Sequence, residues 1–130
     1  MELSYTLGGM NYMSLELVKL QRIMQEFRSL DKEMQAQTML AFLYIAERDG
    51  QGIDTTVLDV GSYLDLTSAS ATRNVQALSK VHRYGKNGHN LVFTEENPQR
   101  RTEKFIRLTV KGKGLRKRLE GYIHVRKAAE

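Results

Sequence analysis

The sequence predicts a mainly α-helical fold with one small β-hairpin, an α+β arrangement in a single domain over residues 1–130. Three observations predict it. Apolar residues recur at helical spacing in several segments, two short runs are rich in β-branched and aromatic residues, and glycine-containing turns separate them. The length suits one domain, and the 41% apolar content suits a buried core.

The composition excludes several classes of protein. The chain has no cysteine, which excludes disulfides, thiol nucleophiles and Cys-ligated metals. Its three histidines lack metal-ligand spacing, and no catalytic motif is present, so we expect no cofactor, no metal and no enzymatic activity. No uncharged apolar run approaches about 18 residues, and the N-terminus lacks a secretory pattern, so we expect a cytoplasmic protein without a membrane segment.

The first predicted helix covers residues 14–30, with Ser14 as its N-cap. Its apolar residues at heptad-like spacing are Leu17, Leu20, Met24 and Phe27. So broad an apolar face must be buried in the domain core or against a second subunit. We therefore regard this helix as a packing or dimerisation element.

Three further helices are predicted before residue 81. Residues 34–48 are apolar nearly all round, which is typical of a central core helix. Residues 55–65 form a short helix, capped by Thr55 or Thr56. Its expected inward residues are Val57, Leu58, Val60 and Leu64. Residues 66–80 follow directly, and two short helices joined by a few residues are typical of a helix-turn-helix.

The helix at 66–80 has a distinct polar face. Thr67 is its predicted N-cap. The apolar residues expected to face the core are Ala71, Val75 and Leu78. The polar positions between them are Ser68, Ser70, Thr72, Arg73, Asn74 and Gln76. Short polar side chains allow a helix to approach the base edges of the DNA major groove closely.

The predicted hairpin consists of residues 90–95 and 103–109, joined by a polar basic tip within 96–104. A final helix at 110–127 is capped by Thr109. Its apolar stripe is Leu115, Leu119, Tyr122 and Ile123. A helix-turn-helix followed by a hairpin is a winged helix, so we expect a winged helix-turn-helix core at 34–109 with flanking helices.

Charge is distributed unevenly along the chain. Residues 1–72 carry 5 Lys/Arg and 10 Asp/Glu, a net charge of −5, whereas residues 73–130 carry 15 and 5, a net charge of +10. A basic half on a small protein is expected of a polyanion binder. The basic residues expected to contact phosphates are Lys80, Arg83, Lys86, Arg100, Arg101 and Lys104.

The run TSASATRNVQALSK, followed by ENPQRRTEKFIRLTVKGKGLRKRL, resembles the winged-helix core of MarR-type transcriptional regulators. The matching residues in the recognition helix are Ser70, Thr72, Arg73, Val75 and Leu78, and those after the wing are Leu108, Thr109 and Gly112. Where the family's wing tip has an Asp-x-Arg pattern, this chain has Asn97 and Gln99. We therefore expect no bracing ion pair at the tip.

The resemblance implies a sequence-specific regulator, a homodimeric repressor that places helix 66–80 in the major groove of double-stranded DNA and the wing beside it. The expected dimer interface comprises Leu17, Leu20, Met24, Phe27, Leu119, Tyr122 and Ile123. Relatives often release DNA on binding a small effector, although no residue here demonstrates a pocket for one. The alternative from the residues is a winged-helix module that binds a protein partner or RNA.

Overall fold

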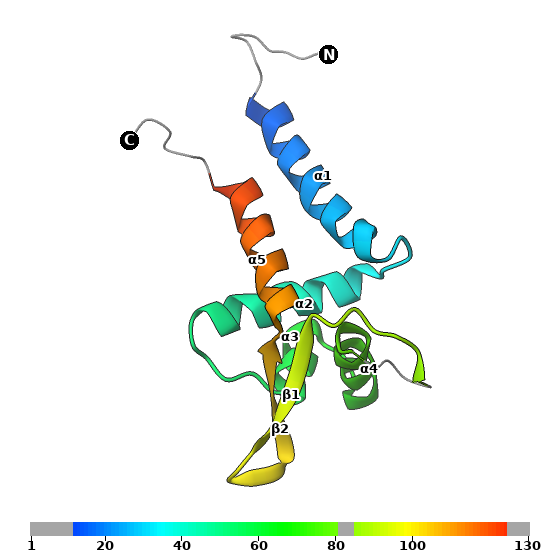
Figure 1. Cartoon of the computed structure of the whole chain (residues 1–130), viewed down its shortest axis with the longest axis vertical. Coiled ribbons are helices and arrows are strands. Elements are labelled where there is room, and N and C mark those ends of the chain that lie inside the picture. Colours follow the sequence, from blue (N-terminus) through cyan, green and yellow to red (C-terminus); the bar gives the residue numbers. More distant parts are fainter. Residues whose placement is uncertain (1–11, 81–84, 125–130) are drawn as a thin grey trace. The chain divides into compact units, whose positions relative to one another are not determined.

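The computed structural model describes residues 12–80 and 85–124, and the chain divides into two compact units. One unit is Met34–Arg116, and the other combines Met1–Glu33 with Lys117–Glu130. The elements are α1 (Tyr12–Leu30), α2 (Ala36–Gly50), α3 (Val57–Leu64), α4 (Ser68–Leu78), β1 (Val92–Asn97), β2 (Arg100–Leu108) and α5 (Val110–Ile123) (Figure 1). Helices with one antiparallel hairpin confirm the predicted fold class.

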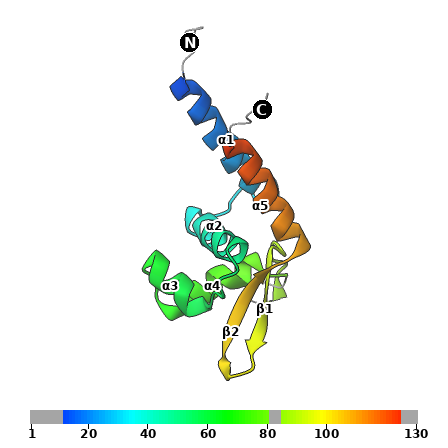
Figure 2. The same cartoon turned by 90° about the vertical axis from the view of Figure 1, so that its left-hand side faces the viewer.

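The core of the 34–116 unit is formed where α2 packs on α3 and α4 (Figure 2). α2 contributes Phe42 and Ile45, both with no exposed surface. Val60 of α3, Leu78 of α4 and Ile106 of β2 are equally buried, at 2% exposure or less. Each fully buried side chain of this size contributes about 1.5–3 kcal/mol, so this layer fixes the helix-turn-helix.

Local capping explains where α3 and α4 begin. The Thr56 hydroxyl accepts a hydrogen bond from the Asp59 N–H at 3.2 Å, and the Asp59 carboxylate accepts from the Thr56 N–H at 3.0 Å, a capping box. α3 ends at Asp65, which has a left-handed φ of 56°. The Thr67 hydroxyl then caps α4 by accepting from the Ser70 N–H, as predicted. These caps confirm the helix-turn-helix.

One prediction for α3 is wrong. Leu58 was expected to face inward, but it is 68% exposed, whereas Val60 is fully buried. A helix of eight residues has room for one buried stripe only, and Val60 and Gly61 occupy it.

The hairpin is longer than the sequence indicated. β1 and β2 pair antiparallel from Val92↔Leu108 to Asn97↔Arg100, with a register shift between Glu96 and Asn97. The strands therefore extend to the turn at the tip, whereas the sequence placed most of the tip in a loop. The hairpin is attached to the residues before α3, because the Ile106 N–H donates to the Thr55 carbonyl at 2.8 Å.

Residues 88–91 form a short strap that caps the C-terminus of α4. Their four consecutive N–H groups donate to the carbonyls of residues 77–80, at 2.7–3.1 Å. The Leu91 carbonyl accepts from the Thr109 N–H, directly before α5. A Cβ at Gly88 would collide with the Ser79 carbonyl, and one at Gly112 with the Leu91 carbonyl. Glycine is therefore required on both sides of the strap.

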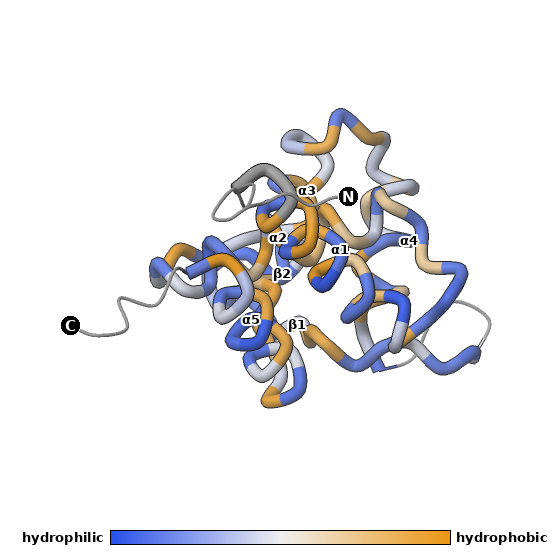
Figure 3. Tube along the Cα trace, turned by 90° about the horizontal axis from the view of Figure 1, so that it is seen from above, coloured by the Kyte–Doolittle hydropathy of each residue, from blue (hydrophilic) through white to orange (hydrophobic). Residues whose placement is uncertain are grey.

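The other unit presents a largely exposed apolar face. On α1, Leu17 is 58% exposed, Leu20 57% and Met24 46%. Figure 3 shows that hydrophobic and hydrophilic residues both occur along the helix traces, and an amphipathic helix gathers its apolar residues on one face. Phe27 and Leu119 are instead buried within a single chain. The sequence alone did not separate these two groups.

α5 begins and ends close to the predicted bounds. The Thr109 hydroxyl accepts from the Gly112 N–H at 2.9 Å, which confirms the predicted cap. The helix ends at Ile123, and the last predicted residues, 125–127, lie outside the described part. Ile123 is 57% exposed, and Tyr122 is half-buried. The Tyr122 hydroxyl donates to the Glu26 carboxylate at 2.6 Å.

Candidate nucleic-acid interface

The inner face of α4 is fixed against the core. Ala71, Val75 and Leu78 are buried, as predicted. Asn74 is also buried, at 5% exposure, which contradicts its assignment to the outer polar face. Its carboxamide accepts from the Thr38 hydroxyl at 2.8 Å and donates to the Ser70 carbonyl at 2.9 Å. Both polar ends are therefore used inside the fold, and Asn74 orients α4 on α2.

The outer face of α4 is polar and exposed. Exposed side chains at helical spacing are Ser68, Thr72, Arg73 and Gln76, followed by Lys80 after the helix. Ser70 is half-buried, and its backbone N–H is bonded to Thr67. Arg73 forms no ion pair with any residue that the structure describes. This face offers hydroxyl, amide and guanidinium groups to a ligand.

The wing has three exposed basic residues, Arg100, Arg101 and Lys104. Arg100 and Lys104 line a groove beside α4, and Arg101 is not among the residues that line it. The sequence analysis assigned the same role, a phosphate contact, to Arg100 and Arg101. Lys86 is exposed beside the strap, and the predicted phosphate contact Arg83 lies outside the described residues.

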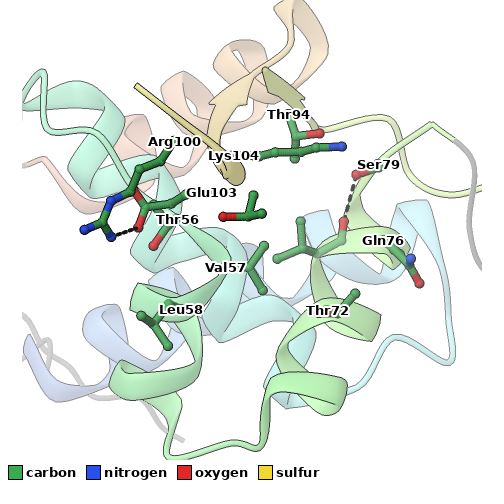
Figure 4. Close-up of a pocket in the computed structure, with 12 residues that line it drawn as sticks. Thr56, Val57, Leu58, Thr72, Gln76, Ser79, Thr94, Arg100, Glu103 and Lys104 are labelled. Carbon is green, nitrogen blue, oxygen red and sulfur yellow. Dashed lines mark hydrogen bonds and ion pairs between the residues drawn. The ribbon is translucent and has the colours of Figure 1, made fainter. Parts of the chain in front are cut away.

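A groove of about 530 Å³ separates α4 from the wing (Figure 4). Both α3 and α4 line it on one side, and β1 and β2 line it on the other. Its polar lining residues are Thr56, Thr72, Gln76, Ser79, Thr94, Arg100, Thr102, Glu103 and Lys104. Many of these groups are hydroxyls that both donate and accept hydrogen bonds.

Sequence reasoning missed several members of this groove, among them Thr56, Ser79, Thr94, Thr102 and Glu103. One signal was present in the sequence. Residues 100, 102 and 104 share the strand face of Ile106, which is buried, so the period-2 pattern of β2 directs them toward the core side.

The tip of the wing is braced, contrary to expectation. The Asn97 side chain is buried, and its oxygen accepts from the Gln99 N–H at 2.9 Å. Its nitrogen donates to the Glu103 carboxylate at 3.2 Å. Arg100 forms an ion pair with that same carboxylate at 4.0 Å. Asn97 and Glu103 together thus brace the turn at the tip of the wing.

The base of the wing is fastened by Arg107, which the sequence analysis did not single out. Its guanidinium donates to Asp54 at 2.8 Å and to Glu95 at 3.0 Å. The hydrogen bond to Asp54, together with that to Glu95, raises the pKa of Arg107 above its usual value. Because Asp54 precedes α3, this cluster connects both strands of the hairpin to the helix-turn-helix.

The described residues lack two other kinds of site. Over residues 12–80 and 85–124, no helix is long and apolar enough to cross a membrane. Within the same ranges, no group of three or more metal-ligating side chains comes together.

Comparison with solved structures identifies the architecture. The crystal structure of MepR from Staphylococcus aureus in complex with DNA matches 85% of this chain and 78% of its own, with a TM-score of 0.61 and 16% identity. The chain has the fold of MarR-type regulators. A MarR-like transcriptional regulator from Thermotoga maritima also matches, with a TM-score of 0.54 and 23% identity over 83% of this chain and 73% of that one.

The likeness lies in structure rather than in sequence. MepR, a transcription regulator of the Staphylococcus aureus multidrug efflux pump MepA, also matches in a second crystal structure, with a TM-score of 0.59 and 17% identity over 85% of this chain and 71% of its own. No protein-family model matches the chain, and no curated protein is significantly similar in sequence. The predicted MarR-type winged helix is confirmed at the level of the fold.

Proposed function

We propose that this protein is a sequence-specific regulator of transcription that binds double-stranded DNA. The observation that carries the proposal is the outer face of α4, exposed and polar along its length, beside a groove and an exposed basic wing. MepR has the same fold and is bound to DNA in its crystal structure, which supports the same use of the fold here.

In this proposal α4 enters the major groove, where base edges present a readable pattern of donors and acceptors. Gln76 is suited to adenine, because its amide both donates and accepts, and Arg73 is suited to guanine or a phosphate. Thr72 is short enough to let the helix approach. Asn74 is excluded from this role because its side chain is bonded inside the fold.

The groove between α4 and the wing suits the sugar-phosphate backbone. Its hydroxyls at Thr72, Thr94 and Thr102 are neutral donors to phosphate oxygens, and Lys104 supplies positive charge. One strand would lie between the helix in the major groove and the wing beside it. Such contacts set the register of the protein on DNA without reading its sequence.

The proposal includes a homodimer that acts as a repressor. Leu17, Leu20 and Met24 of α1, with Ile123 of α5, are exposed apolar residues that a second copy would cover. Two recognition helices in a dimer contact half-sites about 34–36 Å apart on a palindrome. The predicted interface also includes Phe27, Leu119 and Tyr122. Phe27 and Leu119 are buried within the chain, so they would support the interface from beneath rather than contact the second copy.

The proposal is tested by selecting bound duplexes from a random library and measuring their affinities. Gln76→Ala should cost about 1–3 kcal/mol on the selected duplex and relax the preference at one base pair per half-site. Arg28→Ala, an exposed arginine of α1, should leave affinity nearly unchanged. Equal affinity for transfer RNA and for the selected duplex would favour the RNA-binding alternative and overturn the proposal.

A further inference from the structure

The groove contains one feature that opposes DNA. Among the described residues that line it, Glu103 is the only carboxylate, and it lies with Arg100 and Lys104 on the wing side (Figure 4). The phosphate backbone is a polyanion, so a carboxylate at its binding surface lowers affinity unless the carboxylate moves away. Glu103 is therefore expected to weaken DNA binding at this surface.

Glu103 is not free to move away. Its carboxylate accepts from the Asn97 side-chain nitrogen at 3.2 Å. Asn97 is itself 9% exposed, and its oxygen holds the Gln99 N–H at 2.9 Å, so the carboxamide has a fixed orientation. The Glu103 side chain is 31% exposed, whereas that of Glu95 on β1 is 49% exposed. The negative charge is thus held within the groove.

The carboxylate also faces Arg100, at 4.0 Å. The Arg100 side chain is 73% exposed, and exposed ion pairs contribute little to stability. Arg100 is therefore free to exchange the carboxylate for a phosphate. Because Glu103 lies beside it, however, the negative charge of Glu103 offsets the positive charge of Arg100 in the field that the groove presents to DNA.

We propose that Glu103 is a built-in counter-charge that weakens DNA binding by neutralising Arg100 in the groove. This inference rests on the proposed function and adds a residue that sets its strength. Non-specific binding is almost entirely electrostatic. A fixed counter-charge therefore limits binding to random duplexes, while base contacts from α4 still select the operator.

The experiment measures the affinity of the full chain for a selected duplex and for a scrambled duplex over a range of salt concentrations. Glu103→Gln removes the charge and keeps an oxygen that accepts from Asn97. We expect it to bind both duplexes several-fold more tightly at low salt. The slope of log affinity against log salt should steepen by about 0.9 if Arg100 gains one phosphate.

Two further variants separate this mechanism from others. In an Arg100→Gln background, Glu103→Gln should give little gain, because the charge that it releases is absent. Glu96→Gln removes an exposed carboxylate on β1, outside the groove lining, and should give a much smaller gain than Glu103→Gln. Glu103→Ala, which does not depend on the geometry of glutamine, should change affinity in the same direction. Thermal unfolding establishes that each variant is folded.

Several outcomes would overturn the inference while leaving the proposed function standing. These are unchanged or weaker binding by both Glu103 variants, an equal gain from Glu96→Gln, or a gain that persists without Arg100. If the unmodified protein binds neither duplex, the proposed function itself fails.

Discussion

The two compact units differ in where they place their apolar side chains. In the 34–116 unit, Phe42 and Ile45 of α2 have no exposed surface, although Leu40 and Leu43 on the same helix are partly exposed. On α1 of the other unit, Leu17 and Leu20 are more than half exposed. The sequence pattern accounts for part of the difference, because residues 34–48 are apolar nearly all round, whereas residues 14–30 have one broad apolar face.

The contrast indicates different sources of stability. The 34–116 unit buries a core of apolar residues within one chain, although Leu58 and Phe93 stay exposed, and the outer face of its α4 is polar. The other unit leaves a row of leucines in water, and such a row marks an interaction surface when it is contiguous. It also contains specific polar contacts, because Glu26 accepts from both Tyr122 and Arg118. We therefore expect core mutations in the 34–116 unit to change the free energy of unfolding, and mutations on the exposed face of α1 to change the oligomeric state.

The largest effect is expected in the core. Phe42→Ala should reduce the free energy of unfolding by about 3–5 kcal/mol, because it removes a fully buried aromatic ring and leaves a cavity. Leu43→Ala, at the neighbouring position, is the matched control. Leu43 is 38% exposed, and we expect a loss of about 1 kcal/mol or less. Chemical unfolding at fixed protein concentration measures both, and similar losses would contradict the comparison.

A second effect should appear in assembly rather than in folding. Leu17→Glu combined with Leu20→Glu places charges on the exposed face of α1, which should convert the proposed dimer to a monomer. Affinity for a two-site palindrome should then fall by about 100-fold, because the second site loses its effective concentration. Sedimentation and duplex titration measure these changes.

The matched control for that variant is Gln21→Glu, at an exposed α1 residue directly after Leu20. It changes charge without removing an apolar side chain, so the oligomeric state should be retained. A double variant that stays dimeric would show that this face is not the interface.

The sequence predicted much of the fold because local rules agree along this chain. Capping residues such as Thr56 and Thr67 begin α3 and α4 where they were expected. The apolar period of α4 placed Ala71, Val75 and Leu78 in the core. These features depend on residues within a few positions of one another, which is the range over which a pattern is informative.

The features that the sequence analysis missed depend on partners that lie far apart along the chain. Asn74 appears polar and outward by composition, but Thr38 lies 36 residues away and supplies a buried partner. Glu103 faces inward because Asn97, across the turn, holds it there. Arg107 becomes a clamp only when the fold brings Asp54 beside it. Spacing along the chain contains no signal for such pairs.

The smallest predicted effect is a pH dependence in the unit that contains α1. The hydrogen bond from Tyr122 lowers the pKa of Glu26 below its ordinary value, with burial opposing the shift and Arg118 adding to it. A carboxyl whose pKa is lower in the folded state stabilises that state above its unfolded value of about 4.5. This contribution is lost as pH falls through the lower, folded pKa.

Tyr122→Phe removes the main cause of the shift, so the variant should lose less of its Tm than the unmodified protein as pH falls below about 4.5. At neutral pH the variant should have a slightly lower Tm than the unmodified protein. Tyr63→Phe makes the same chemical change on α3, where the tyrosine ring stacks on Tyr44, and should leave the acid dependence unaltered. Parallel acid profiles for the unmodified protein and Tyr122→Phe would show that the Glu26 contact does not stabilise this unit. The difference between the two units would then rest on their apolar faces alone.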